Sequence, residues 1–342
     1  MISKADLVHH VTSLQETFDR NPWLIFFDKL LAVALLHFAM ADVNALVLEV
    51  GIGGKYDSTN FFERPAKASI ITHVSYDHQA LLGNSLQEIS SQKAGIIKPG
   101  TVVFSCDSQP DPVRQVIEEV AKAMQVELVL VGPDKQKAFA RNVVLKNTLG
   151  VPSWVLPDNL ALAEAAAACA GLTLKGFDKA SWPCRFEVFD VGPMRTKLVI
   201  DGAHNEGSVH KLMLTLAERF PGRQVHRVFG AAADKDLVPL IQAVCLGRGS
   251  LFLVHAHHPR AANTEELRKR LPAAGVEEGL RVCELKGLAV EKGLELAMQA
   301  CDNNGVVVVC GSFFVASQAR EWLAREYPSL FNICDWVYEA DL

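Results

Sequence analysis

A carboxylate followed by glycines is the first feature of this sequence that could do chemistry. Glu49 lies in the apolar run at 45–50, and Gly51, Gly53 and Gly54 follow it. Burying a carboxylate is costly unless it is paired or binds a metal, and glycines let the backbone approach a ligand closely. We therefore expect Glu49 to face a ligand; a buried, hydrogen-bonded glutamate beside a structural turn is the alternative. The glycine spacing does not match the dinucleotide-binding fingerprint.

Two further segments place titratable side chains directly after short apolar runs. Asp77 and His78 follow the run at 69–74, and Asp201 and His204 follow a later one. In open α/β sheets, ligands bind beyond the carboxyl ends of the strands. Asp77 and His78 can bind a divalent cation or a phosphate, although capping of a neighbouring helix is the commoner role for such a pair. The segment with Asp201 and His204 also fits a tight turn between a strand and a helix.

Small residues follow two other apolar runs, in FGAAADKD at 229–236 and CGS at 310–312. Small residues leave room for a ligand at a helix N-terminus. Each segment also fits an ordinary turn between a strand and a helix, and Lys93 alone fits a solvated helix lysine.

The elements that must position these residues alternate between short apolar strands and amphipathic helices. In the first part we predict a mostly buried helix at 23–40, strands at 45–50, 69–74, 101–106 and 126–132, and helices at 85–93 and 111–124. An alanine-rich helix ending near 170 and two strands joined near Gly192 follow. A second series then has helices at 207–219, 236–245, 264–271, 289–300 and 314–326, and strands at 225–230, 251–256, 281–285 and 305–310. This alternation predicts an α/β fold with open, mostly parallel sheets flanked by helices.

Length and composition limit the class of protein. The 342 residues suffice for about two domains of roughly 150 residues, and 49% hydrophobic residues are typical of a packed globular protein. The net charge of -5 does not favour nucleic acid or an anionic membrane as a partner. Asp28, Lys29 and His37 interrupt the longest apolar stretch, which argues against a membrane span. The eight cysteines show no C-x-x-C spacing, so we expect reduced thiols in a cytoplasmic protein.

The order of the motifs is more specific than any one of them. The chain resembles the folylpolyglutamate synthase and dihydrofolate synthase family of the Mur ligase superfamily from about residue 20 to residue 326. The resemblance rests on EVGIGGKYDSTN, DHQALLG, QKAGIIKPG, WPCRFE, IDGAHN, FGAAADKD, HHPRA and CGSFFVAS. It implies two domains, a central ATP- and folate-binding domain at 1–185 and a Rossmann-like, C-terminal glutamate-ligase domain at 186–342.

The resemblance also implies an activity. Enzymes of this family transfer the γ-phosphoryl group of ATP to a substrate carboxylate, and the amine of L-glutamate then attacks the acyl phosphate. The implied small molecules are ATP, Mg²⁺, L-glutamate and either a folate or dihydropteroate, with no redox cofactor. The sequence does not distinguish addition of the first glutamate from chain extension.

The resemblance assigns residues to the metal ions and the pterin. Glu49 is similar to the family's magnesium ligand, and His78 to the ligand of a second magnesium. Lys93 is similar to a catalytic lysine that becomes carbamylated, which turns an ammonium into an anion able to bind that second metal. Asp77 is expected to help seat the pterin.

Other positions are similar to the family's nucleotide and glutamate contacts. Asn159 matches an adenine contact, and Asp201 matches a ribose contact. Arg185 and His204 match catalytic groups that reach the γ-phosphate, and Ser312 lies in the segment that helps form the glutamate pocket.

Three departures accompany the resemblance. The 342 residues contain no G-T-N-G-K-G-[ST] phosphate loop, which predicts that the N-terminal strand, loop and helix of the ATPase domain are missing. Cys184 stands where the family usually has Gly or Ala, and the connector before Asn159 is short. The alternatives are therefore a truncated, catalytically inactive protein that binds folate or glutamate, and a related Mur-type amide ligase. We expect a monomer that acts on small molecules.

Overall fold

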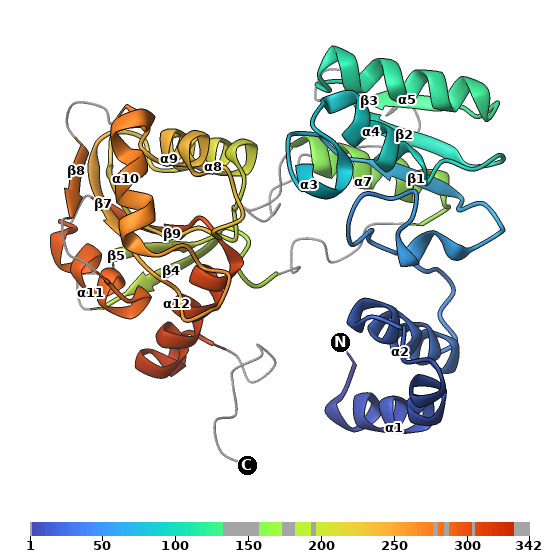
Figure 1. The fold of residues 1–342 in the computed structure, drawn as a ribbon, viewed down its shortest axis with the longest axis horizontal. Helices are drawn as coiled ribbons and strands as arrows, with labels where there is room; N and C mark the ends of the chain where they lie inside the picture. The colour runs from blue at the N-terminus through green and yellow to red at the C-terminus, as the bar shows by residue number, and fades with distance from the viewer. Residues whose placement is uncertain are drawn as a thin grey trace. The chain divides into compact units, whose positions relative to one another are not determined.

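The computed structural model of this chain describes residues 2–132, 157–172, 182–192, 196–275, 280–283, 287–302 and 305–331. These residues form two compact units (Figure 1). The first unit holds the elements from α1 to α7, and the second holds those from β4 to η3. Each unit has parallel strands flanked by helices, which confirms the predicted α/β class. Most of the connector before Asn159 lies outside the described residues.

The described part of the first unit has a three-stranded parallel sheet in the order β1-β2-β3. Its strands are β1 (Ala68–Ile71), β2 (Val102–Cys106) and β3 (Leu128–Val131). Its helices around this sheet are α3 (Gln79–Leu82), α4 (Leu86–Ala94), α5 (Asp111–Ala123) and α7 (Pro157–Cys169), and Ser58–Phe61 form the 3₁₀ turn η1. Successive side chains of β2 point to opposite faces, so Val103 packs with α4 and α5 whereas Phe104 packs with α7.

The predicted strand at 45–50 is wrong. This segment is not a strand in the structure, and it pairs with none of the described strands. Val47 exposes 84% of its surface, and Glu49 is exposed as well. A strand requires a hydrogen-bonded neighbour, and the described first sheet begins at β1. An apolar run predicts a tendency to be buried but does not supply the partner.

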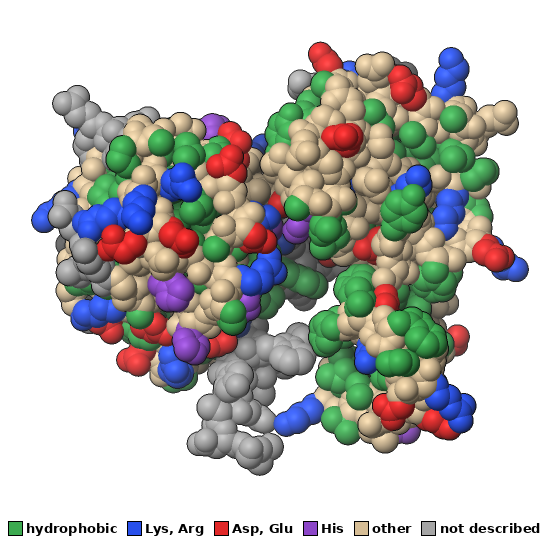
Figure 2. Space-filling model, in the orientation of Figure 1, with side chains coloured by type: hydrophobic (Ala, Val, Ile, Leu, Met, Phe, Trp, Pro, Cys, Tyr) green, Lys and Arg blue, Asp and Glu red, His purple; other side chains and the backbone are tan. Residues whose placement is uncertain are grey.

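The N-terminal residues form two helices in contact, α1 (Lys4–Arg20) and α2 (Phe26–Met40). Helix α1 was not predicted from the sequence, although Ser3 caps it by accepting a hydrogen bond from Asp6 N at 3.0 Å. The helix predicted at 23–40 is present as α2, but the expectation that it is mostly buried is wrong, because Val33 is its only buried residue and Phe26 is 80% exposed. Figure 2 shows hydrophobic side chains on the surface of this helical pair. Among the described residues, no helix combines the length and apolar character needed to cross a membrane.

The second unit contains a six-stranded sheet in its described residues, in the order β4-β5-β9-β6-β7-β8. Strands β4 and β5 pair antiparallel, and the other pairs are parallel. The strands are β4 (Glu187–Val191), β5 (Thr196–Ile200), β6 (Gln224–Phe229), β7 (Gly249–Leu253), β8 (Leu280–Cys283) and β9 (Gly305–Cys310). The helices are α8 (Glu206–Arg219), α9 (Leu237–Val244), α10 (Thr264–Ala274), α11 (Val290–Ala300) and α12 (Phe313–Glu326), followed by the 3₁₀ turn η3 (Pro328–Leu330).

Strand β9 is covered by helices on both faces of the sheet. It reads GVVVVC, and all six residues are buried. Val306 and Val308 pack against the core beneath α8 and α9, whereas Val307 and Val309 pack against α11 and α12. A strand covered on both faces needs a continuous apolar run, which is the pattern that predicted it.

Candidate functional site

Three segments identified from the sequence meet at the carboxyl ends of β5 and β9. Gly202 N donates to Cys184 O at 2.8 Å, and Gly311 N donates to Ala203 O at 2.8 Å. The turn at 182–187, the DGAHN loop and the start of α12 are thus connected by backbone hydrogen bonds. This is the edge of a parallel sheet where ligands are expected.

The ring of Phe313 lies against two predicted site residues. The Cζ atom of Arg185 is 4.7 Å from the centroid of that ring, and the imidazole of His204 is centred 5.4 Å from it. A Cβ atom at Gly202 would overlap the same ring, so a side chain there would displace it. The structure therefore places Arg185 and His204 against the same aromatic ring, and the π-electrons of that ring attract the guanidinium of Arg185.

Asp201 accepts hydrogen bonds from the backbone of two segments, the turn at 182–187 and its own DGAHN loop. Its Oδ2 accepts from Phe186 N at 2.8 Å, and its Oδ1 accepts from Ala203 N at 2.7 Å. Burial raises the pKa of Asp201, although these two hydrogen bonds and the nearby charges of Arg185 and His204 act in the opposite direction. A carboxylate held in this way can still accept a hydrogen bond from a ligand hydroxyl, because each oxygen has a second lone pair.

His204 is oriented by its own loop. Its Nδ1 lies 2.9 Å from Gly202 O, and a carbonyl can only accept, so Nδ1 carries the proton of this contact. In the neutral ring, Nε2 is then the acceptor; in the charged ring, both nitrogens donate. The charged form can neutralise part of a phosphate.

Ser312 is almost fully buried, at 3% exposure, and caps α12. Its Oγ accepts from Val315 N at 3.2 Å. Capping accounts for a serine here, and its part in a glutamate pocket stays a prediction.

A second cluster of side chains lies beyond the neighbouring strands, and the sequence pattern assigned no role to Asp234, His258 or Arg260 individually, although FGAAADKD was expected to leave room for a ligand. His258 stacks on Phe314 with ring centroids 3.6 Å apart, and Arg260 Nη2 lies 2.8 Å from Asp234 Oδ2. These residues follow β6, β7 and β9, which are neighbours in the sheet. Arg260 keeps 62% of its side chain exposed, so its guanidinium is available to a carboxylate. The signal in the sequence was the placement of polar residues directly after predicted strands.

In the first unit, Asp77 and His78 form the start of the short helix α3. Asp77 Oδ1 accepts from His78 N at 2.8 Å, and His78 Nε2 lies 3.9 Å from Asp77 Oδ2. His78 has a φ of +50°, in the left-handed region that a non-glycine residue seldom adopts. Strain of this kind persists where the surroundings impose it, and it is common at functional sites.

Lys93 lies near the end of α4 and is partly buried. Burial lowers its pKa from the usual value of 10.5, and the negative charge of Asp77 opposes that shift. The two predicted residues are thus close enough to interact. A lysine with a lowered pKa holds more of its amine in the neutral, nucleophilic form, which is the form that reacts with carbon dioxide.

The loop that follows Glu49 packs against the same helix. Lys55 N donates to Gln92 O at 2.8 Å, and a Cβ atom at Gly54 would lie 3.0 Å from Lys93 O. The close approach requires glycine at 54. The segment after Glu49 therefore reaches the backbone that carries Lys93.

The residues of the first unit fit a magnesium site completed by water and a bound ligand better than a site made of protein side chains alone. In the described part of the chain, no group of three His, Cys, Asp or Glu side chains is placed to hold a metal ion. Magnesium usually binds through one or two carboxylates together with water and substrate phosphates. The exposed carboxylate of Glu49 matches that mode of binding. Where an ion binds, it neutralises phosphate charge.

The two remaining residues that the sequence singled out are Asn159 and Cys184. Asn159 is exposed in the first turn of α7. Cys184 is buried with a φ of +59°, in the left-handed region that favours glycine. Burial raises the pKa of the Cys184 thiol to about 12, so it is not a nucleophile at neutral pH.

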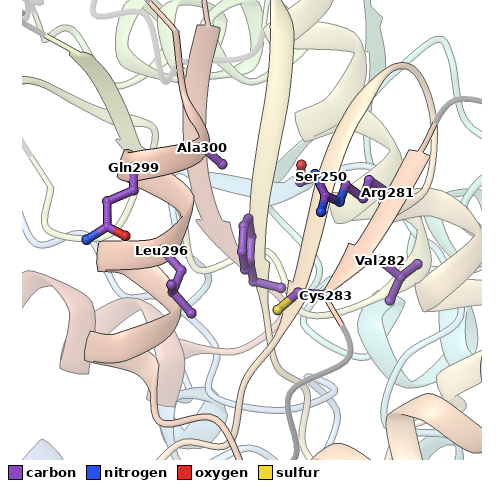
Figure 3. Close-up of a pocket in the computed structure, with 8 residues that line it drawn as sticks. Ser250, Arg281, Val282, Cys283, Leu296, Gln299 and Ala300 are labelled. Carbon is purple, nitrogen blue, oxygen red and sulfur yellow. The ribbon is translucent and has the colours of Figure 1, made fainter.

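A cavity of about 630 Å³ lies elsewhere in the second unit (Figure 3). It is formed by β7, β8 and α11 and lined by Ser250, Phe252, Arg281, Val282, Cys283, Leu296, Gln299 and Ala300. It contains none of the predicted site residues, so it is separate from the carboxyl-end cluster.

Comparisons with known proteins agree with the motifs. Residues 184–313 match the family described as Mur ligase, glutamate ligase domain. A dihydrofolate synthase/folylpolyglutamate synthase of Bacillus subtilis is 26% identical, over 92% of this chain and 75% of the relative. A bifunctional folylpolyglutamate synthase/dihydrofolate synthase of Yersinia pestis, complexed with AMPPNP and manganese, is 26% identical with a TM-score of 0.76, over 95% of this chain and 76% of that one.

A further structure of a bifunctional enzyme of this type, with manganese, AMPPNP and L-glutamate bound, is 25% identical with a TM-score of 0.73. It covers 95% of this chain and 77% of that one. The comparisons confirm the resemblance and the α/β architecture that the motifs indicated.

Proposed function

We propose that this chain, whose residues 184–313 match a Mur ligase glutamate-ligase domain, catalyses the ATP- and magnesium-dependent ligation of L-glutamate to a folate or to dihydropteroate. The observation that carries the proposal is the cluster of Arg185, Asp201 and His204 at the carboxyl end of β5. All three residues fall within the matched domain. The ligands of the related structures support the choice of nucleotide, divalent cation and amino acid.

In this proposal the reaction proceeds in two steps. An oxygen of the folate carboxylate attacks the γ-phosphorus of ATP, ADP leaves, and an acyl phosphate forms. The amine of glutamate then attacks the acyl carbon, loses a proton, and expels phosphate as the amide bond forms. Arg185 and His204 would stabilise the charge on the transferred phosphoryl group, since both contact the ring of Phe313. Asp201 would hold the ribose, and Asn159 the adenine.

For the first unit we propose Glu49 as a magnesium ligand and His78 as a ligand of a second magnesium. Carbamylated Lys93 would share that second ion, and Asp77 would contact the pterin. The lowered pKa of Lys93 and its proximity to Asp77 support a reactive amine at this position. Incubation with ¹³C-bicarbonate should give a carbamate NMR signal in the wild type and in a Lys122→Arg control, which changes an exposed lysine of α5, but not in Lys93→Arg. A signal that persists in Lys93→Arg would exclude Lys93 as the modified residue.

The proposal includes the domain organisation and the setting. We place an ATP- and folate-binding domain before a boundary near Arg185, and a glutamate-ligase domain with Ser312 in its substrate pocket after it; the turn that carries Arg185 belongs to the second compact unit. Arg260, with its exposed guanidinium, is a further candidate for holding the glutamate carboxylate. We propose a cytoplasmic monomer, and light scattering after size-exclusion chromatography tests the oligomeric state.

The deciding experiment measures incorporation of labelled glutamate by the purified chain. Tetrahydrofolate, dihydropteroate and nucleotide-linked muramyl peptides are offered separately, each with ATP and magnesium. Incorporation into a pterin supports the proposal, and Arg185→Ala and His204→Ala should each reduce it by roughly a hundredfold. Incorporation into the muramyl substrate alone would show a Mur-type ligase. Binding of AMPPNP or a folate without any incorporation would support an inactive binding protein.

A further inference from the structure

The turn that carries Arg185 is strained on both sides of that residue. Cys184 has a φ of +59° and Phe186 a φ of +44°, and neither is a glycine. A non-glycine residue rarely adopts this region, and it persists there only where neighbouring contacts impose it. Something must therefore hold the backbone on each side of Arg185.

Two carboxylates supply that restraint. Cys184 N donates to Glu187 Oε2 at 2.7 Å, and Phe186 N donates to Asp201 Oδ2 at 2.8 Å. The N–H groups immediately before and after Arg185 are thus both bound by acidic side chains. Asp201 already has a proposed role at the ribose, whereas Glu187 has none.

Glu187 is in turn fixed by Arg320 of helix α12. Arg320 Nε donates to Glu187 Oε1 at 3.1 Å and to Oε2 at 3.0 Å, and Arg320 is only 9% exposed. The Cζ of Arg320 also lies 5.0 Å from the ring centroid of Phe331. A buried arginine and carboxylate in contact resist separation, because breaking the pair leaves an uncompensated buried charge.

Helix α12 contributes to the position of Arg185 twice. Its first residue, Phe313, lies against the guanidinium, and its Arg320, two turns later, holds the carboxylate that fixes the backbone of the turn. The side chain and the main chain of Arg185 are therefore anchored to one rigid element. Catalytic groups require this kind of support, since a displacement of about 1 Å can cost about a hundredfold in rate.

We propose that Glu187 and Arg320 are positioning residues, which hold the strained turn at 182–187 so that the Arg185 guanidinium stays against the ring of Phe313. The inference rests on the proposed function, in which Arg185 reaches the γ-phosphate. It predicts that the pair acts through Arg185 and not through a substrate of its own.

The test compares Glu187→Gln and Arg320→Lys with a matched control in the full chain. Asp190→Asn is the control, because Asp190 lies on the same strand as Glu187 but forms its ion pair outside the turn. Its Oδ1 lies 2.6 Å from Lys197 Nζ. Glu187→Gln should lower kcat for glutamate incorporation roughly tenfold to a hundredfold, with KM for glutamate changed less than about twofold. Arg320→Met, which removes the charge, should lower kcat as Glu187→Gln does. Arg320→Lys keeps the charge and should retain part of the activity that Arg320→Met loses. Asp190→Asn should behave as the wild type.

A double-mutant cycle separates positioning from loss of stability. In an Arg185→Ala background, Glu187→Gln should lower kcat by no more than about twofold, because the group that it positions is gone. An equal further fall in that background would overturn the inference. So would an unchanged kcat in the single variant.

A structural measurement keeps the inference testable if the wild type forms no amide, an outcome that would count against the proposed function alone. The Arg185 Nε–Hε resonance, assigned through its loss in Arg185→Lys, should carry a ring-current shift from Phe313 in the wild type and in Asp190→Asn. Glu187→Gln should move it towards the value of a solvated arginine. An identical resonance in Glu187→Gln would refute the positioning role.

Discussion

At the scale of single residues, the ring of Phe313 contacts two side chains of the candidate site. Phe313 contacts Arg185 and His204, and its contact with Gly202 explains why the DGAHN loop has a glycine there. The sequence pointed to Arg185 and His204 through their motifs, but Phe313 is an ordinary apolar residue of a helix pattern. Only the fold identifies it as part of the site.

Phe313→Leu should therefore weaken activity without unfolding the second unit. A cation–π contact contributes about 0.5–1 kcal/mol, so loss of the ring should lower kcat for glutamate incorporation roughly two- to fivefold. Phe220→Leu is the control, because it removes another contact between an arginine, Arg223, and a phenylalanine. An equal loss of activity in both variants would argue against a specific role for Phe313.

Lys93 makes a prediction about pH. Burial lowers its pKa in the folded state below 10.5, so the folded protein releases this proton at a lower pH than the unfolded chain does. The free energy of unfolding should then rise with pH between the lowered pKa and 10.5, because the unfolded state binds more protons in that window. Denaturant unfolding of the wild type and of Lys93→Met across this range measures the difference. A constant difference between the two proteins would contradict the shift.

At the scale of elements, one carboxylate holds together the loop that follows Glu49. Asp57 Oδ2 accepts from Gly51 N and Ile52 N, both at 3.0 Å, and Oδ1 accepts from Thr59 N at 2.9 Å. Burial alone would raise the pKa of Asp57, but these hydrogen bonds and one from the Thr59 hydroxyl outweigh it and hold the pKa below 3.8. Its stabilising effect is present above 3.8 and is lost as the pH falls through the lowered pKa.

Asp57→Ala should therefore release this loop while the helices of the first unit stay folded. We expect a local cost of about 2 kcal/mol, which corresponds to roughly thirtyfold faster hydrogen exchange at the amides of Gly51 and Ile52. Glu88→Ala is the matched control, because Glu88 Oε2 accepts from Asn84 N and Ser85 N at the start of α4. Faster exchange at Gly51 in the Glu88 variant but not in the Asp57 variant would contradict this account.

Elements differ in how well the sequence predicted them. The helix α5 and the strand β9 follow their patterns closely, because an amphipathic stripe and an unbroken apolar run each match the surface that they bury. The segment at 45–50 is also a short run of mostly apolar residues, but it is not a strand. Pairing is a tertiary property, and no periodicity within the segment reveals whether a neighbour is present.

At the scale of the whole molecule, the described residues divide into two compact units with separate cores. Val103 is buried between the helices and the sheet of the first unit, and Val308 lies in the central strand of the second. Units with separate cores can unfold in separate transitions.

Calorimetry should resolve two transitions, each sensitive to one core. Val103→Ala and Val308→Ala each remove two methyl groups from a buried site, at a cost of roughly 2 kcal/mol. Val103→Ala should lower the midpoint of one transition only, and Val308→Ala that of the other. A single transition lowered by both substitutions would show that the units unfold as one.

The sequence alone determined the order of strands and helices over most of the described chain and the placement of polar residues after the strands, because burial patterns and glycine positions are local. It also identified Arg185, Asp201 and His204 as candidate site residues, because they lie in two of the motifs on which the family resemblance rests. The tertiary structure decided which of these residues meet, as on the ring of Phe313, and which supports fix them, as Glu187 and Arg320 do 133 residues apart. Contacts between distant segments depend on how the sheet orders its strands, and that order is set by the packing of the whole unit.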